Sequence, residues 1–337
     1  MVDLRGASAG LERRAGRVIF RRGMGVAFVG RGRWRPKEEE SGMMEITIWG
    51  SRGSVPVSGE RFARHGGATT CVEIALEGAS GETPSRVIID CGTGLSELGR
   101  SWGGRSLSGL FLQTHMHWDH IQGFPFFVPF YNPASRFDFW SVPREGQRFE
   151  EVLSGQMTRP TFPVGLDIMP ASLSFEALRP EGSARLGELV VAWDEVWHPS
   201  GSTAWCLSYK DATVVFTGDV EVQKGSGDKL VKLAKGADLL IMDAQYTPQE
   251  YPSRAGFGHS TPIDAVEVAL EAGVRHLLLT HHDPGHDDEA LEAKLEAGRL
   301  RAQGEGLRVN NARDGMRVKV APSMRARAAG DLAWAPL

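Results

Sequence analysis

Three histidines and a carboxylate stand close together in Thr114-His115-Met116-His117-Trp118-Asp119-His120, directly after the apolar run Leu110-Phe111-Leu112. The apolar run predicts a buried strand, so the polar cluster falls where that strand ends. Burying such groups without a partner is costly or shifts their pKa values. A metal ion removes this cost, because neutral imidazole and carboxylate are ligands that metals prefer. The stretch therefore predicts a metal site at a strand end.

The spacing within the cluster suits two ions. His115 and His117 are two residues apart, so in an extended segment they project to the same side. Asp119 and His120 follow where the chain turns, and we expect them to face a second ion nearby.

More ligand-type residues occur at the ends of other predicted strands. His198 follows an apolar segment, Asp219 stands in Thr217-Gly218-Asp219, and His281 follows Leu277-Leu278-Leu279-Thr280. Ligands gather at the carboxyl ends of strands in α/β sheets, so we expect these residues to meet the first cluster. The chain reads His281-His282, and His282 is the alternative ligand at this position.

Strand and helix patterns alternate from Met44 onward, which predicts an α/β protein with sheets covered by helices. Thr261, Pro262 and Asp264 form a good helix start, with Thr261 as N-cap. The predicted strands are 45–49, 71–76, 86–90, 110–114, 189–197, 204–209, 213–217, 239–243 and 276–280, and the predicted helices are 228–235, 262–272 and 287–302.

Composition excludes several classes of protein. The formal net charge of −4 is not that of a typical nucleic-acid-binding protein, and 41% hydrophobic residues support a sizeable core. No apolar stretch approaches the roughly 18 residues that a membrane span needs. The three cysteines are far apart, which favours reduced thiols and a cytoplasmic location. Cysteine can bind zinc, but we expect Cys91 to be a small buried core residue instead.

The first 43 residues differ from the rest, being rich in Arg and Gly without a sustained apolar period. We expect them to be disordered or absent from the native protein, because Met43-Met44 directly precedes the first clear strand. A basic arm and a targeting peptide are the alternatives. The predicted organisation is one hydrolase-type domain at 44–322 and a tail at 323–337.

The order of these motifs resembles the metallo-β-lactamase superfamily of hydrolases. The resemblance runs from about Met44 to Val320, and Ile88-Ile89-Asp90-Cys91-Gly92 looks like the superfamily's first motif. It implies an αββα sandwich, in which two sheets face each other, helices lie outside and metals bind at one edge. It also implies two divalent ions, for which Zn²⁺ is the first expectation and Mn²⁺ or Fe the alternatives.

The same resemblance assigns roles to the cluster residues. His115, His117 and His198 would bind the first ion, and Asp219 would bridge the two ions. Asp119, His120 and His281 would bind the second ion. Asp90 would hold a ligand histidine by its other ring nitrogen.

A second motif points to phosphodiester hydrolysis. Gly258-His259-Ser260-Thr261 resembles the histidine-serine-threonine motif of the phosphodiesterase branch that contains the tRNA 3′-processing endonucleases. There the histidine stabilises or protonates the departing group and an acidic residue orients it. Asp243 stands at the corresponding position, although the sequence Met242-Asp243-Ala244-Gln245 differs from the usual His-Glu-Ala-Thr motif. Asp119, His259 and Asp243 are therefore the expected catalytic residues.

We expect a phosphodiesterase that acts on a small nucleotide-type diester through a hydroxide held between the two metals. A cyclic nucleotide is one candidate for this diester. Arg52 and Arg64 lie in stretches similar to cyclic-nucleotide phosphodiesterases and are candidates for phosphate contact, with a surface role as the alternative. A tRNA 3′-end endonuclease and a lactone or thioester hydrolase are the rival functions. Nucleic acid is not the favoured partner, since no lysine-rich, glycine-rich insertion is visible.

The segment from Gly123 to Pro170 is dense in aromatic residues and proline. One interpretation is a packed cover over the core. The other is a wall of the substrate pocket or a contact in a homodimer, because the segment directly follows the histidine cluster.

Overall fold

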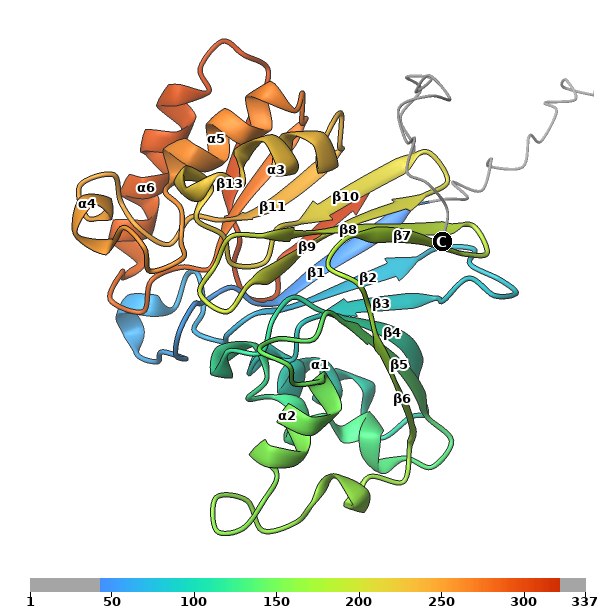
Figure 1. Cartoon of the computed structure of the whole chain (residues 1–337). Coiled ribbons are helices and arrows are strands. Elements are labelled where there is room, and N and C mark those ends of the chain that lie inside the picture. Colours follow the sequence, from blue (N-terminus) through green and yellow to red (C-terminus); the bar gives the residue numbers. More distant parts are fainter. Residues whose placement is uncertain (1–42, 322–337) are drawn as a thin grey trace, which may run out of the picture. The chain divides into compact units, whose positions relative to one another are not determined.

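A computed structural model describes residues 43–321 of the chain, which form two mixed sheets of seven strands each (Figure 1). Apart from Met43, the expectations for residues 1–43 and 323–337 lie outside the described residues. The first sheet has the order β14 (Arg317–Val320), β1 (Met44–Gly50), β2 (Cys71–Leu76), β3 (Arg86–Ile89), β4 (Ser108–Gln113), β5 (Arg136–Ser141), β6 (Ser172–Ala177). The second has the order β13 (Arg308–Asn311), β12 (His276–Thr280), β11 (Leu239–Asp243), β10 (Ala212–Phe216), β9 (Ser202–Tyr209), β8 (Leu189–Val196), β7 (Gly182–Leu186).

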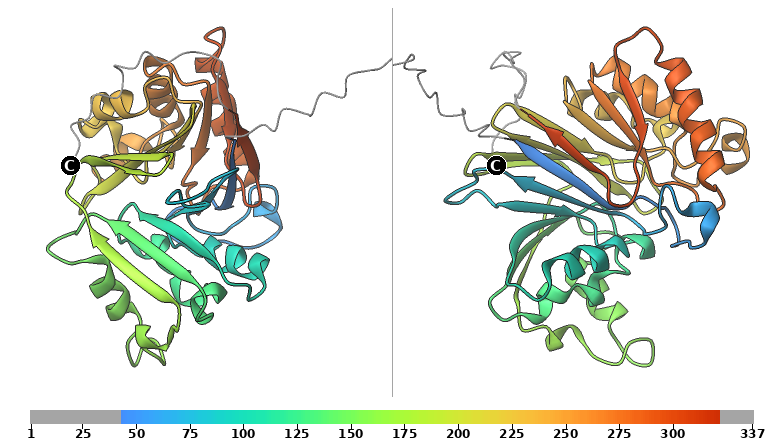
Figure 2. Two further views of the ribbon diagram at one scale, coloured as in Figure 1. Left: turned by 90° about the vertical axis from the view of Figure 1, so that its right-hand side faces the viewer. Right: turned by 180° about the vertical axis from the view of Figure 1, so that it is seen from behind.

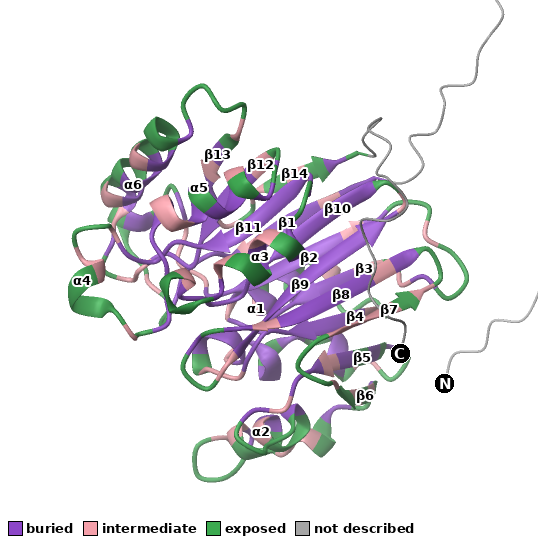
Figure 3. Cartoon of the chain, turned by 45° about the horizontal axis from the view of Figure 1, so that its top comes forward, coloured by how far each residue is buried: buried purple, intermediate pink, exposed green. Residues whose placement is uncertain are grey.

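The main core lies between the two sheets. Ile46, Val72 and Leu112 of the first sheet belong to one buried cluster with Trp193 and Leu207 of the second. These strands are almost free of exposed residues, and Figure 3 shows the central strands as buried along most of their length. Burial on both faces explains why several strands appear in the sequence as unbroken apolar runs.

Helices cover the outer faces of both sheets, which completes the predicted αββα sandwich (Figures 1 and 2). Leu230, Val266 and Leu295 from three helices pack on the second sheet, and Leu95 and Leu153 from two others pack on the first. The helices on the second sheet are α3 (Gly227–Leu233), α5 (Pro262–Glu271) and α6 (Asp288–Arg301), those on the first are α1 (Gly94–Trp102) and α2 (Phe149–Gln156), and α4 (Tyr251–Arg254) is a single turn. The 3-10 turns are η1 (Glu60–Phe62), η2 (Trp118–His120), η3 (Phe124–Phe126), η4 (Val128–Tyr131), η5 (Leu166–Ile168) and η6 (Val222–Lys224).

The start of α5 follows the predicted capping pattern. The Thr261 hydroxyl accepts a hydrogen bond from the backbone N–H of Asp264, and the Asp264 carboxylate accepts one from the backbone N–H of Thr261. Pro262 occupies the first helical position, where its missing N–H costs nothing. This cap fixes the end of the loop that carries His259.

Part of the aromatic segment 123–170 covers the core, as the first interpretation predicted. Phe124, Phe127, Phe130 and Phe137 are buried with Phe111 of β4 in a single cluster on the outer face of the first sheet. Other aromatic residues of the segment, including Phe126 and Tyr131, remain exposed. The segment therefore both covers the core and presents an aromatic surface.

None of the helices between residues 43 and 321 has the length and apolar character needed to cross a bilayer.

Candidate metal centre

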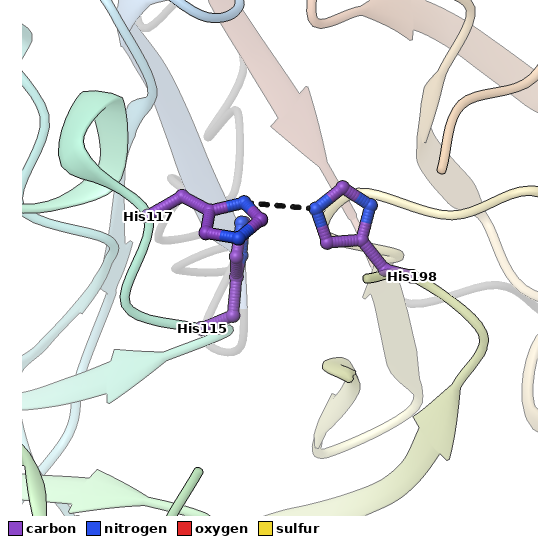
Figure 4. Close-up of side chains that lie close together, drawn as sticks. All are labelled: His115, His117 and His198. Atoms are coloured by element: carbon purple, nitrogen blue, oxygen red, sulfur yellow. Dashed lines mark hydrogen bonds between the residues drawn. The ribbon is translucent and has the colours of Figure 1, made fainter. Parts of the chain in front are cut away.

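Three histidines from two segments converge at one edge of the sandwich (Figure 4). His115 and His117 follow β4, and His198 follows β8 of the opposite sheet. Their ligand atoms lie within 4.8 Å of one another, and Nε2 of His198 is 3.0 Å from Nδ1 of His117. These are the three residues that the family resemblance assigned to the first ion.

A second group lies beside the first and is centred on Asp219, which follows β10. Its Oδ2 lies 3.1 Å from Nε2 of His281, 3.3 Å from Nε2 of His120, 3.5 Å from Nε2 of His115 and 3.9 Å from Nε2 of His198. One carboxylate oxygen thus has imidazoles of both groups around it, as the predicted bridging position requires. Asp119, His120, Asp219 and His281 form a cluster whose ligand atoms lie within 4.8 Å of one another.

Asp90 supports His120 from behind, in the position that was predicted for it. Its Oδ2 lies 2.7 Å from Nδ1 of His120, and its carboxylate accepts hydrogen bonds from the backbone N–H and hydroxyl of Thr114. This contact leaves Nε2 of His120 facing the cluster, and it fixes the orientation of the ring.

The backbone is strained at this edge. Ser54, Asp90 and His281 have φ values of 64°, 62° and 57°, a left-handed region that costs a non-glycine residue about 1–3 kcal/mol. Each of these residues contacts the cluster: the N–H of Ser54 donates to Oδ2 of Asp119 over 2.6 Å. Gly53 is needed beside them, because a Cβ there would collide with the His281 ring.

Gln245 is a supporting residue that the sequence did not single out. Its Oε1 lies 3.0 Å from Nδ1 of His281, and its Nε2 donates to Oδ2 of Asp283 over 3.3 Å. Its backbone oxygen accepts a hydrogen bond from the buried ammonium of Lys294. The departure of Met242-Asp243-Ala244-Gln245 from the usual motif was the available signal, since it placed an amide two residues after the expected acid.

His259 and Asp243 meet next to the cluster. Nδ1 of His259 lies 2.8 Å from Oδ2 of the fully buried Asp243, and the His259 ring stacks on that of His281 with centroids 4.8 Å apart. The loop carrying His259 is held by Glu221, whose carboxylate accepts from the N–H groups of Gly256 and Gly258. Glu221 gave no signal in the sequence, because its partners are backbone groups of a distant loop.

Electrostatics divide the cluster into neutral and charged groups. Burial lowers the pKa of His115 well below its ordinary value and that of His198 to about 4, so each keeps a ring nitrogen with a free lone pair at pH 7. Burial tends to raise the pKa of Asp219, but the surrounding imidazoles, His120 first, lower it well below its usual value. Burial opposes protonation of His281, yet Asp219 and Asp119 raise the pKa of His281 to about 9.

The donor set fits divalent metal ions. Nε2 of His115 is buried without a hydrogen-bond partner, and Nε2 of His120 faces Nε2 of His281 at 3.3 Å. The neutral imidazoles of His115 and His198 beside the ionised Asp219 suit a cation, which would take the place of the proton that the carboxylates hold on His281. His115, His117 and His198 would hold one ion, Asp119, His120 and His281 the other, and Asp219 both.

The structure also places the other candidate residues that the sequence offered. His282 points away from the cluster, with Nε2 2.9 Å from the backbone oxygen of Ala312, and Cys91 is a buried residue outside the candidate ligand groups. The proposal that Arg52 contacts phosphate is wrong, because its side chain is fully buried and donates to the backbone oxygens of Gly66, Asp283 and His286. Arg64 is exposed and lies 3.6 Å from Asp288.

Comparison with known proteins agrees with this geometry. The model of the family described as beta-lactamase superfamily domain matches residues 85–282, which contain every residue of the two candidate ligand groups. The chain belongs to this superfamily. It is accordingly a metal-dependent hydrolase of the metallo-β-lactamase type, with a site for divalent metal ions.

Two relatives and one solved structure illustrate the similarity. A ribonuclease Z of Brevibacillus brevis is 40% identical over 83 residues, and this match covers only 25% of either chain. A ribonuclease Z of Bradyrhizobium is 25% identical over 299 residues, covering 76% of this chain and 95% of the relative. The metallo-β-lactamase fold protein YhfI of Bacillus subtilis has a TM-score of 0.61 at 22% identity, covers 82% of this chain and 99% of its own, and supports the fold of this superfamily member.

Proposed function

We propose that this superfamily member is a dinuclear metal-dependent phosphodiesterase that acts on a small nucleotide-type diester. The observation that carries the proposal is the His259–Asp243 pair beside the metal cluster. Hydrolysis of an alkyl phosphodiester needs a proton for the departing alcohol, whereas a thioester releases a thiolate, which departs readily without one. A positioned imidazole next to the metals is what the harder reaction requires.

The metal ions and the residues around them would have separate roles in the reaction. When bound, two divalent ions supply Lewis acidity that activates water and neutralises charge on the phosphoryl oxygens. Asp243 accepts from Nδ1 of His259 and so leaves Nε2 as the nitrogen available to the substrate. That nitrogen holds the proton that the departing oxygen takes up. Asp119 is fixed by the N–H of Ser54, which keeps its carboxylate turned into the cluster.

A substrate panel tests the proposal. Metal-analysed protein would be assayed on bis(p-nitrophenyl) phosphate, a cyclic nucleotide, a β-lactam, a lactone and a thioester. We expect turnover of the diesters above that of the carboxyl derivatives. Turnover confined to the lactone or thioester would refute the phosphodiesterase assignment.

Cleavage of tRNA precursors at the 3′ end is the second candidate, and the names of the ribonuclease Z relatives favour it. The assay uses a precursor tRNA with a 3′ trailer at two salt concentrations. If the second candidate is right, cleavage leaves a mature 3′ end and weakens steeply with salt, because tRNA binding releases counterions. If the small-diester proposal is right, the precursor is cut no faster than a dinucleotide.

A further inference from the structure

A large hollow adjoins the candidate metal centre on the Asp119 side. Its volume is about 820 Å³, within the range of about 300–1,000 Å³ typical of small-molecule sites. Trp118 lines it and directly precedes Asp119, and Val55 lines it and directly follows Ser54, whose N–H binds Asp119. The hollow therefore begins where the metal-binding edge ends.

The walls come from four segments on the outer side of the first sheet. They are helix α1 with its N-cap, the stretch from η2 to η3, the end of α2 with the loop that follows it, and the loop after β1 that contains Val55 and Pro56. Two aromatic residues of segment 123–170, Phe126 and Phe162, line the hollow. Core packing does not explain why Phe126 is exposed, whereas a role in lining the hollow does.

The aromatic side chains in the hollow lie open to solvent. Trp118 is 70% exposed and Phe126 58% exposed. Phe126 forms an edge-to-face pair with Phe162 at 6.0 Å between centroids, so two rings make one continuous wall. Exposure of large aromatic residues around a hollow is costly in water and marks a surface that binds something flat and apolar.

The polar groups in the hollow are neutral hydroxyls and amides with one exception. Gln122 and Gln156 line it. Nε2 of Gln156 donates to the backbone oxygen of Ile121, and its Oε1 is buried without a hydrogen-bond partner. The one charged lining residue, Arg100, is already paired with Glu97. Amides with free capacity suit the edge of a heterocycle, whereas a phosphate chain would need several unpaired cations.

We propose that this hollow, lined by Trp118, Phe126 and Phe162, is the subsite for a nucleobase of the substrate, next to the phosphoryl group at the metals. This inference rests on the proposed phosphodiesterase function and gives it a specificity: diesters that carry a flat heterocycle are preferred over aliphatic ones. A base stacks on the aromatic wall, and its polar edge meets the two glutamine amides.

Equilibrium binding tests the subsite separately from catalysis. Affinities of the full-length, metal-loaded protein for adenosine 5′-monophosphate and ribose 5-phosphate would be compared by calorimetry, since the two differ only in the base. We expect the nucleotide to bind about tenfold more tightly or better, because each stacked base adds a stacking contact. Equal affinities would overturn the subsite.

Variants locate the effect. Phe126→Ala and Phe162→Ala, which lie outside the metal cluster, should bring the affinity ratio close to one. Trp118→Ala should do the same and Trp118→Phe should keep the preference, with metal content measured because Trp118 adjoins Asp119. Leu300→Ala is the matched control, an exposed apolar residue on α6 that does not line the hollow, and it should keep the wild-type ratio. An unchanged ratio in Phe126→Ala and Phe162→Ala would overturn the assignment.

Failure of the subsite and failure of the proposed function give different results. A protein that hydrolyses bis(p-nitrophenyl) phosphate but binds both ligands equally would overturn the subsite and leave the phosphodiesterase. A protein that prefers the nucleotide in binding but hydrolyses no diester would overturn the phosphodiesterase and leave the subsite.

Discussion

Replacing His259 by Ala is the perturbation that the His259–Asp243 contact makes most informative. The imidazole is fixed by a 2.8 Å contact with Asp243 and by stacking on His281. Asp243 is fixed in turn, because its carboxylate also accepts from the N–H groups of Val220 and Gln245. A proton donor held this rigidly needs little reorganisation during the reaction.

The expected loss depends on the leaving group. For a dinucleotide, whose leaving group is an alcohol, loss of a positioned general acid should lower kcat by about 10²- to 10⁴-fold, which corresponds to about 3–5 kcal/mol of transition-state stabilisation. For a p-nitrophenyl diester the departing anion is stable without a proton. The same variant should therefore lose no more than about tenfold on that substrate.

The assay compares kcat for thymidylyl-thymidine and for thymidine 5′-p-nitrophenyl phosphate in His259→Ala and in a control, His276→Ala. His276 is the first residue of strand β12, and His281 directly follows that strand. Nε2 of His276 contacts Oδ1 of Asn310, outside the cluster. The control should keep wild-type rates on both substrates. Equal losses on both substrates in His259→Ala would refute the general-acid role.

Three further predictions concern metal binding and stability. Asp219→Ala should lose both bound metal and activity, and a variant that retains two ions by metal analysis would show that Asp219 is not a bridging ligand. Gln245→Leu, which removes the partner of Nδ1 of His281, should weaken zinc affinity by about 10- to 100-fold in chelator competition; unchanged affinity would exclude this support. Thr261→Ala should lower the free energy of unfolding by about 1 kcal/mol in urea titration, because it breaks the capping box with Asp264, and an unchanged midpoint would contradict that.

Much of the fold was predictable because the strands that carry the site are buried on both faces. Strands β2, β11 and β12 match the predicted ranges 71–76, 239–243 and 276–280, and α5 begins at the predicted cap. The resemblance to the superfamily supplied the sandwich arrangement, which apolar runs alone do not specify. The two sheets then bring the strand ends together at one edge.

The elements that the sequence did not reveal lack such a pattern. Strand β6 lies at the edge of its sheet and has no buried residue; its six residues alternate polar and apolar side chains, but the run is too short to stand out in the sequence. Helix α2 lies inside the aromatic and proline-rich segment 123–170, for which no helix was predicted. Supporting residues such as Gln245 and Glu221 act through contacts between distant segments, and a single sequence does not show such contacts.

The most direct test of the central claim is zinc titration of metal-free protein while hydrolysis of bis(p-nitrophenyl) phosphate is followed. The account predicts that two zinc ions bind per chain, that diester hydrolysis returns as they bind, and that Asp219→Ala shows neither effect. Binding of two ions without diester hydrolysis, or hydrolysis that persists in metal-free protein, would contradict it.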